Sequence, residues 1–206
     1  MFNGCTSLTT APALPATTLG YECYAYMFYG CTSLTTAPAL PATTLTERCY
    51  IEMFFNCTSL TTAPVLPATT LDAYCYSEMF RGCTSLTTPP VISATTITNY
   101  KNYSCSWMFA GCTSLTTAPE LNITILKNYS FQNMFYNAEN VNYIKMLSTD
   151  ISASGCLSNW VSGVAATGIF VKNINAAWTD TGASGVPTGW TVIYYDTTED
   201  KYYLDQ

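Results

Sequence analysis

The ten cysteines of this 206-residue chain are its most reactive side chains, because thiols can form disulfides, bind metals and act as nucleophiles. Nine of them occupy two recurring positions, and the tenth is Cys156. If the residues from Cys23 to Cys31 form a helix, they span about 12 Å at roughly 1.5 Å per residue. A disulfide needs its two Cα atoms within about 7 Å of each other. We therefore favour burial as small apolar side chains, with some disulfides and, more remotely, a metal site as alternatives.

Histidine is absent, which excludes Ser-His-Asp and Cys-His nucleophile systems and most zinc chemistry. The carboxylates are scattered through variable segments, so each is interpreted as a solvated surface charge. A glycosidase-like pair is an alternative that no spacing supports. The sequence predicts no enzyme, no catalytic residue, no metal site and no cofactor. The carboxylates concerned are Glu22, Glu47, Glu52, Asp72 and Glu78.

Charged residues form 10% of the chain, and the formal net charge is −6. Average domains carry roughly 25% charged residues, so the low proportion favours a secreted or surface-displayed protein. No basic stripe is available to displace counterions from phosphate, so nucleic acid is not an expected partner. No apolar run reaches the ~18 residues of a membrane span. An export signal is missing as well, and Met1 stands in mid-unit, so we expect a fragment or an unusual export route.

The repeated string MF-x-(G/N)-C-T-S-L-T-T gives these cysteines their regular spacing. It begins at Met1, Met27, Met53, Met79 and Met108, and a decayed copy begins at Met134. The intervals are therefore 26, 26, 26, 29 and 26 residues. A period of this length is typical of solenoids, in which each unit covers the apolar face of its neighbour.

Each unit is predicted to contain a short strand and a short helix. Leu34, Ala37 and Leu40 have the spacing of a leucine-rich strand, and Pro38 must lie where no N–H donor is needed. The segment Cys49–Phe54 is predicted to be a helical or 3₁₀ turn. Its C-terminal cap falls on a residue suited to the left-handed conformation, which is Asn56 here and Gly30, Gly82 or Gly111 in sister units.

The fold class expected is α/β: a leucine-rich-repeat solenoid over 1–146, about five and a half units long, with a small α+β capping segment over 147–206. Within the cap, residues 154–164 are predicted to form a short helix and Gly168–Lys172 a strand. Trp190–Tyr195 and Lys201–Leu204 are predicted to form a hairpin that covers the open edge of the solenoid.

The pattern MF-x-G-C-T-S-L-T-T-A-P-x-L-P-A-T-T-L resembles the BspA-type leucine-rich repeats of bacterial surface proteins. The resemblance covers about 1–145. The segments that begin at Cys156 and Gly185 are similar to those that close such repeats in Bacteroides-like proteins of the gut and in their phages. This resemblance implies a role in adhesion or binding at the cell surface and identifies no catalytic residue.

Aromatic residues gather just before and within the predicted helical turn, where the units differ most. Exposed aromatic side chains suit protein or sugar ligands, although half or more could instead pack between units. We expect a non-enzymatic adhesion module that binds host protein, matrix protein or glycan from outside the cell. The alternative is a spacer or phage fibre that associates end to end through its uncapped N-terminal edge. The candidate ligand-binding residues are Tyr21, Tyr26, Tyr74, Tyr100, Tyr103 and Trp107.

Overall fold

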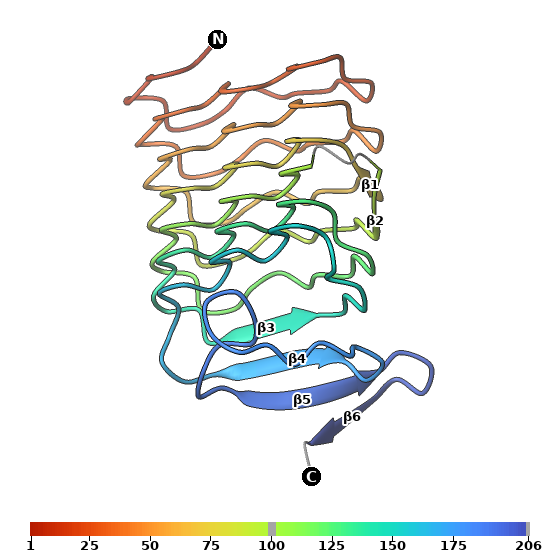
Figure 1. The fold of residues 1–206 in the computed structure, drawn as a ribbon. Coiled ribbons are helices and arrows are strands. Elements are labelled where there is room, and N and C mark those ends of the chain that lie inside the picture. The colour runs from red at the N-terminus through yellow and green to blue at the C-terminus, as the bar shows by residue number, and fades with distance from the viewer. Residues whose placement is uncertain (99–101, 205–206) are drawn as a thin grey trace.

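The chain winds into a stack of coils, each about one repeat long (Figure 1). The computed structural model describes residues 1–98 and 102–204. Equivalent threonines of successive coils pair in parallel, from Thr10 to Thr36, on to Thr62 and then to Thr88. The register of the stack therefore equals the sequence repeat. The fourth interval of the repeat is three residues longer than the others, and residues 99–101 within it lie outside the described residues.

Regular strands are short in the repeats and longer towards the C-terminus. β1 (Thr70–Leu71) and β2 (Thr96–Ile97) form a two-stranded parallel sheet. β3 (Tyr143–Met146), β4 (Ile169–Asn173) and β5 (Thr191–Asp196) lie side by side in parallel, and β6 (Lys201–Leu204) pairs with β5 in antiparallel fashion. The predicted strand at Gly168–Lys172 and the predicted hairpin are thus confirmed. The division of the chain at 146/147 stays a prediction, because parallel pairing continues across it from β3 to β4.

The predicted helices are wrong. The residues that the structure describes contain no α- or 3₁₀-helix, neither at Cys49–Phe54 nor over 154–164. Each coil instead has a turn segment, and these lie at 21–30, 47–56, 73–82, 104–111 and 128–137, with another at 154–163.

Hydrogen bonding explains why the turn segments are not helical. The N–H of Met27 donates to Tyr24 O (3.3 Å), three residues back, whereas the N–H of Phe28 donates to Met53 O (3.0 Å) in the next coil. An α-helix would keep every bond within one segment, four residues apart. The turn segments do repeat every four residues, as a helix nearly does, but they do so because every fourth residue has a left-handed conformation.

That left-handed position was predicted correctly, although the helix it was expected to cap is absent. Gly30, Asn56, Gly82 and Gly111 have φ of 67°, 54°, 74° and 71°. Glycine adopts this conformation without a Cβ clash and asparagine tolerates it. Along the turn segments it recurs at non-glycine residues such as Glu52 (φ 50°).

Equivalent apolar side chains form continuous files through the core. Six phenylalanines stack ring on ring with centroids 5.6–5.7 Å apart and interplanar angles of 4–8°. The leucines of the T-S-L string are fully buried in a similar file, which contains Leu34, Leu60, Leu86 and Leu115. The phenylalanines of this file, which we call the Phe file, are Phe2, Phe28, Phe54, Phe80, Phe109 and Phe135.

The ten cysteines are free thiols, and most of them are buried. The thiol of Cys57 donates to Phe28 O at 3.1 Å, and Cys83 repeats this bond to Phe54 O at 3.1 Å. Burial raises the pKa of Cys57 and of Cys112 to about 12. The packing interpretation of the sequence is therefore confirmed over the disulfide alternative.

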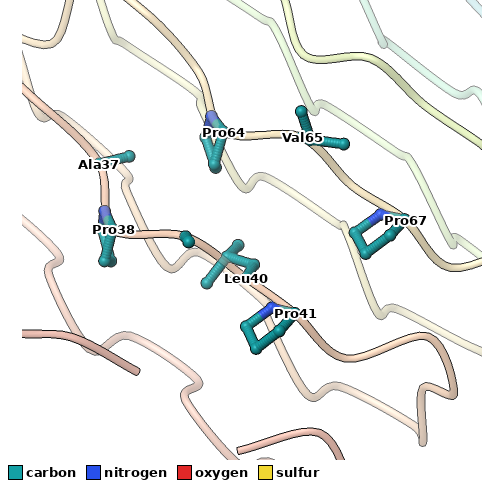
Figure 2. Close-up of a pocket in the computed structure, with 8 residues that line it drawn as sticks. Ala37, Pro38, Leu40, Pro41, Pro64, Val65 and Pro67 are labelled. Atoms are coloured by element: carbon teal, nitrogen blue, oxygen red, sulfur yellow. The ribbon is translucent and has the colours of Figure 1, made fainter. Parts of the chain in front are cut away.

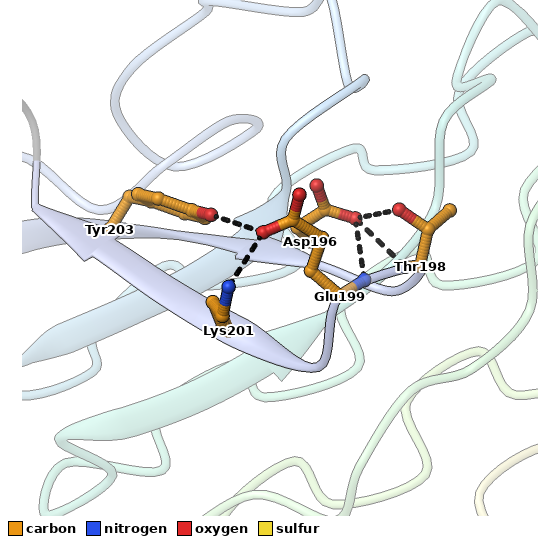
Figure 3. A network of polar contacts seen from close by, with 5 residues as sticks. All are labelled: Asp196, Thr198, Glu199, Lys201 and Tyr203. Carbon is orange, nitrogen blue, oxygen red and sulfur yellow. Dashed lines mark hydrogen bonds and ion pairs between the residues drawn. The ribbon is translucent and has the colours of Figure 1, made fainter.

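The β5–β6 hairpin is organised by carboxylates (Figure 3). Asp196 Oδ1 accepts hydrogen bonds from the hydroxyl of Thr198 (2.6 Å) and from two backbone N–H groups. These bonds lower the pKa of Asp196. Glu199 in turn accepts from Lys201 and from the hydroxyl of Tyr203, each at 3.0 Å.

Over the ranges described, no helix is long and apolar enough to cross a membrane.

Candidate functional site

The predicted tyrosines of the central coils form a second aromatic file, at the first left-handed position of each turn segment. Tyr74 stacks on Tyr103 with centroids 5.0 Å apart, and Tyr103 stacks on Tyr129 at 4.8 Å, both at 10°. Rings stacked in parallel cover one another's faces and leave mainly their edges and hydroxyls outward. This Tyr file therefore offers polar edge contacts more than flat apolar ones.

Two of the other predicted tyrosines, Tyr21 and Tyr26, lie away from this file. Tyr21 is 61% exposed and its hydroxyl bonds with Glu22, which raises its pKa. Tyr26 is 40% exposed and tilts at 50° against Tyr29, 6.4 Å away. Tyr100 lies outside the described residues. The five predicted residues that the structure describes therefore do not form one site, and the ligand contacts expected of all six stay a prediction.

Trp107, the sixth predicted residue, lines a groove that we call the Trp107 groove. Its volume is about 370 Å³, which falls in the range of small-ligand sites. The indole lies 5.4 Å from the ring of Tyr136 and is tilted against it by 54°. This tilt sets the pair apart from the parallel Tyr and Phe files. The groove is lined by Phe55, Asn56, Arg81, Gly82, Trp107, Ala110, Gly111, Tyr136 and Asn137.

Arg81 is the cation of this groove. Its guanidinium carbon lies 4.6 Å from the centroid of Trp107 and 5.4 Å from that of Phe55, so the guanidinium contacts aromatic rings of two coils. Its Nη1 also donates to Glu78 Oε2 at 2.7 Å. The side chain is thereby held in place, and its charge is balanced locally.

Sequence reasoning found Trp107 but missed Arg81, Tyr136 and the two asparagines. The signal that could have found them is the alignment of the repeats on one another. It places Arg81 in the column of Tyr29, Phe55, Ala110 and Tyr136, and Asn137 in the column of left-handed residues. A small residue such as Ala110, next to the ring of Tyr136 in its column, predicts a gap in the stack.

A second hollow, of about 460 Å³, lies over the proline-containing segments of two neighbouring coils (Figure 2). Pro38 and Pro41 of one coil face Pro64 and Pro67 of the next, with Val65 between the latter two and 57% exposed. Proline and alanine carry no polar side-chain group, so this surface lacks the oriented donors and acceptors that give a ligand site its specificity. The Trp107 groove, in contrast, has side chains that supply such donors and acceptors.

In residues 1–98 and 102–204, no three His, Cys, Asp or Glu side chains are grouped so that they could hold a metal ion. Burial raises the pKa of the interior thiols, for example that of Cys105 to about 12, which makes them poor nucleophiles. No family model, curated protein or solved structure matches the chain.

Proposed function

We propose that the protein is a non-enzymatic binding module, a leucine-rich-repeat solenoid of the BspA-like kind that is displayed outside the cell and adheres to host protein, matrix protein or glycan. The repeat motif and the parallel register of the coils support the architecture. The low proportion of charged residues supports the extracellular location.

The observation that carries the binding role is the Trp107 groove. It combines an indole and a phenol ring set at an angle with a fixed guanidinium and two exposed amides. Aromatic and arginine side chains dominate the binding energy of many recognition surfaces, because they bury large areas at low entropic cost. The tyrosines of the neighbouring file would extend the contact along the stack.

Adhesion of the purified chain to immobilised glycans, matrix proteins and cultured cells tests this proposal. We expect saturable binding that weakens when Tyr103 and Trp107 are replaced by alanine, with the thermal midpoint little changed. Loss of folding in that double variant would move both residues to a structural role. Absence of binding to every surface would contradict the proposal.

The alternative function is that of a spacer or fibre element that assembles through its N-terminal coil. Its support is that Phe2 stacks on Phe28 alone, and that Cys5 is exposed where its counterparts Cys31 and Cys57 are buried. That face of the first coil matches the surface that each interior coil covers. Light scattering over a concentration series tests it, since a strictly monomeric chain with ligand affinity contradicts assembly.

A further inference from the structure

The Trp107 groove exists because the small residues of two columns coincide. In the outer column, Tyr29 and Phe55 stack at 4.6 Å and 1°, and Arg81 continues the row over Phe55. At the next coil the column holds Ala110, so the ring that would cover Tyr136 is missing. Trp107 leans into this gap from the neighbouring column, at 54° to Tyr136. A ring in a parallel file presents its edge, whereas a tilted ring presents part of its face.

The floor of the groove is backbone. Gly82 and Gly111 stand in the left-handed column with φ of 74° and 71°, and their Cα atoms contribute no side chain to the hollow. The same column holds Asn56 one coil before and Asn137 one coil after, and both are exposed. Asn56 Oδ1 lies over Gly82 and so borders the floor, whereas Asn137 Oδ1 lies over Gly163 of the following coil. Among the described residues, no hydrogen bond from the amide of Asn56 is found. Each amide can both donate and accept.

The charges of the groove select against ions. Arg81 is paired with Glu78 at 2.7 Å, so an anionic ligand that approached the guanidinium would also meet the negative charge of that carboxylate. A cation on the indole would meet the guanidinium that lies 4.6 Å from the ring centroid. A wholly apolar ligand would strip water from the amides and the guanidinium without replacing its hydrogen bonds.

What fits is a neutral molecule with an apolar flat side and a rim of hydroxyls. We propose that the Trp107 groove binds a neutral saccharide, one pyranose ring of which places its C–H side on the tilted aromatic pair of Trp107 and Tyr136. Its hydroxyls bond with the amide of Asn56 and with the fixed Arg81–Glu78 pair. This assignment rests on the proposed binding function and names its ligand class.

The test is titration of the intact chain with neutral trisaccharides built from glucose, galactose, mannose or N-acetylglucosamine, and with a galacturonate trimer as the acidic counterpart. Isothermal calorimetry reports affinity. We expect one neutral series to bind and the acidic trimer to bind at least tenfold more weakly, a difference of about 1.4 kcal/mol.

The repeats themselves supply variants that the fold accepts. Glu52 and Glu78 occupy the column of Trp107, so Trp107→Glu has a structural precedent, and we expect it to weaken binding by about 30-fold. Trp107→Tyr has a precedent in Tyr26 and should recover part of the affinity. Asn56→Gly follows the glycines of its own column and should cost about fivefold.

Val65→Thr, on the proline-lined hollow, is the matched control and should bind as the parent chain does. Neutral saccharides that fail to bind, while a matrix protein binds and is lost on Trp107→Glu, would overturn the saccharide assignment and leave the proposed function standing. Equal affinity for the galacturonate trimer would overturn it too. If no probe of either class binds, both proposals fail together.

Discussion

The aromatic rings of the core meet at different angles in the coils up to Phe135 and in the closing region after it. Within the coils, each ring of the Phe file meets the next at 4–8°. Beyond Phe135, Trp160 meets that ring at 59°, Phe170 meets Trp160 at 83°, and Trp178 meets Phe170 at 76°. The last coils thus pack edge on face, and no flat ring continues the file.

The two regions also differ in the side chains that donate hydrogen bonds to carbonyls of neighbouring coils. In the coils the thiols of Cys57 and Cys83 donate weak hydrogen bonds to carbonyls of the preceding coil. In the closing region the donors are indole N–H groups, from Trp160 to Gly185 O of the following segment at 2.8 Å and from Trp178 to Ser148 O of an earlier one at 3.0 Å. Identical stacked rings give every coil the same surface. The larger indole rings, each with a single N–H donor, instead make the C-terminal end of the stack different from the coils.

The largest effect is expected where the Phe file changes direction. Trp160→Ala removes a fully buried side chain and leaves Gly185 O without its donor, so the free energy of unfolding should fall by about 3–5 kcal/mol. Phe2→Ala, at the partly exposed first ring, should cost clearly less. Chemical denaturation measures both, and equal losses would mean that the closing region anchors the stack no better than its first coil does.

Alanine substitutions at Gly168 and Gly30 test two different ways in which an added Cβ lowers stability, by steric overlap and by an unfavourable backbone conformation. A Cβ on Gly168 would meet Asn142 O and Trp190, so Gly168→Ala should destabilise by about 1–3 kcal/mol through overpacking. At Gly30 a Cβ has room, its nearest neighbour being Gly4 Cα at 3.9 Å, so Gly30→Ala should cost about 1 kcal/mol for its positive φ. Urea denaturation compares them, and a larger cost at Gly30 would reverse the argument.

Thiol labelling compares the two regions by reactivity. At pH 8 a disulfide reagent should modify the exposed Cys5 rapidly and the half-buried Cys23 more slowly, while the eight buried thiols wait for unfolding. Burial raises the pKa of Cys156 in the closing region to about 11 and that of Cys57 in the coils to about 12, so both should be protected. Mass spectrometry locates the labels. Fast modification of Cys57 in the folded chain would show that the coils open locally.

The smallest effects concern two carboxylates with opposite signs. Burial raises the pKa of Glu52, so folding favours its protonated form; this stabilisation is present below the unfolded pKa and is lost as pH rises through the folded pKa, above which the ionised side chain opposes folding. Glu52→Gln should therefore raise the thermal midpoint at pH 7. Hydrogen bonds lower the pKa of Asp196, so its stabilisation is present above the unfolded pKa and is lost as pH falls through the folded one. Asp196→Asn should lower the midpoint at pH 7.

The Glu52 difference should vanish once pH lies well below the unfolded pKa of a glutamate, and the Asp196 difference should vanish only once pH lies below its lowered folded pKa. Thermal denaturation at pH 7 and at low pH provides the comparison. Shifts of the same sign at pH 7 would contradict it.

The sequence alone determined the repeat, its register and the closing hairpin. A motif that recurs every 26 residues can bury its apolar residues only against copies of itself, so Leu34, Leu60 and their equivalents had to come together. The left-handed positions at Gly30 and Asn56 could be predicted from residue type, because glycine and asparagine adopt positive φ more readily than other residues do.

The tertiary structure alone decided two matters. The turn segments look helical by spacing, but alternate N–H groups reach carbonyls of the next coil, such as Phe28 to Met53, and no pattern within one unit reveals that partner. The Trp107 groove likewise depends on Ala110, Gly82 and Gly111 falling side by side between two coils. Local residue types specify what one coil can do, whereas hydrogen bonds and gaps between coils depend on how neighbouring coils align.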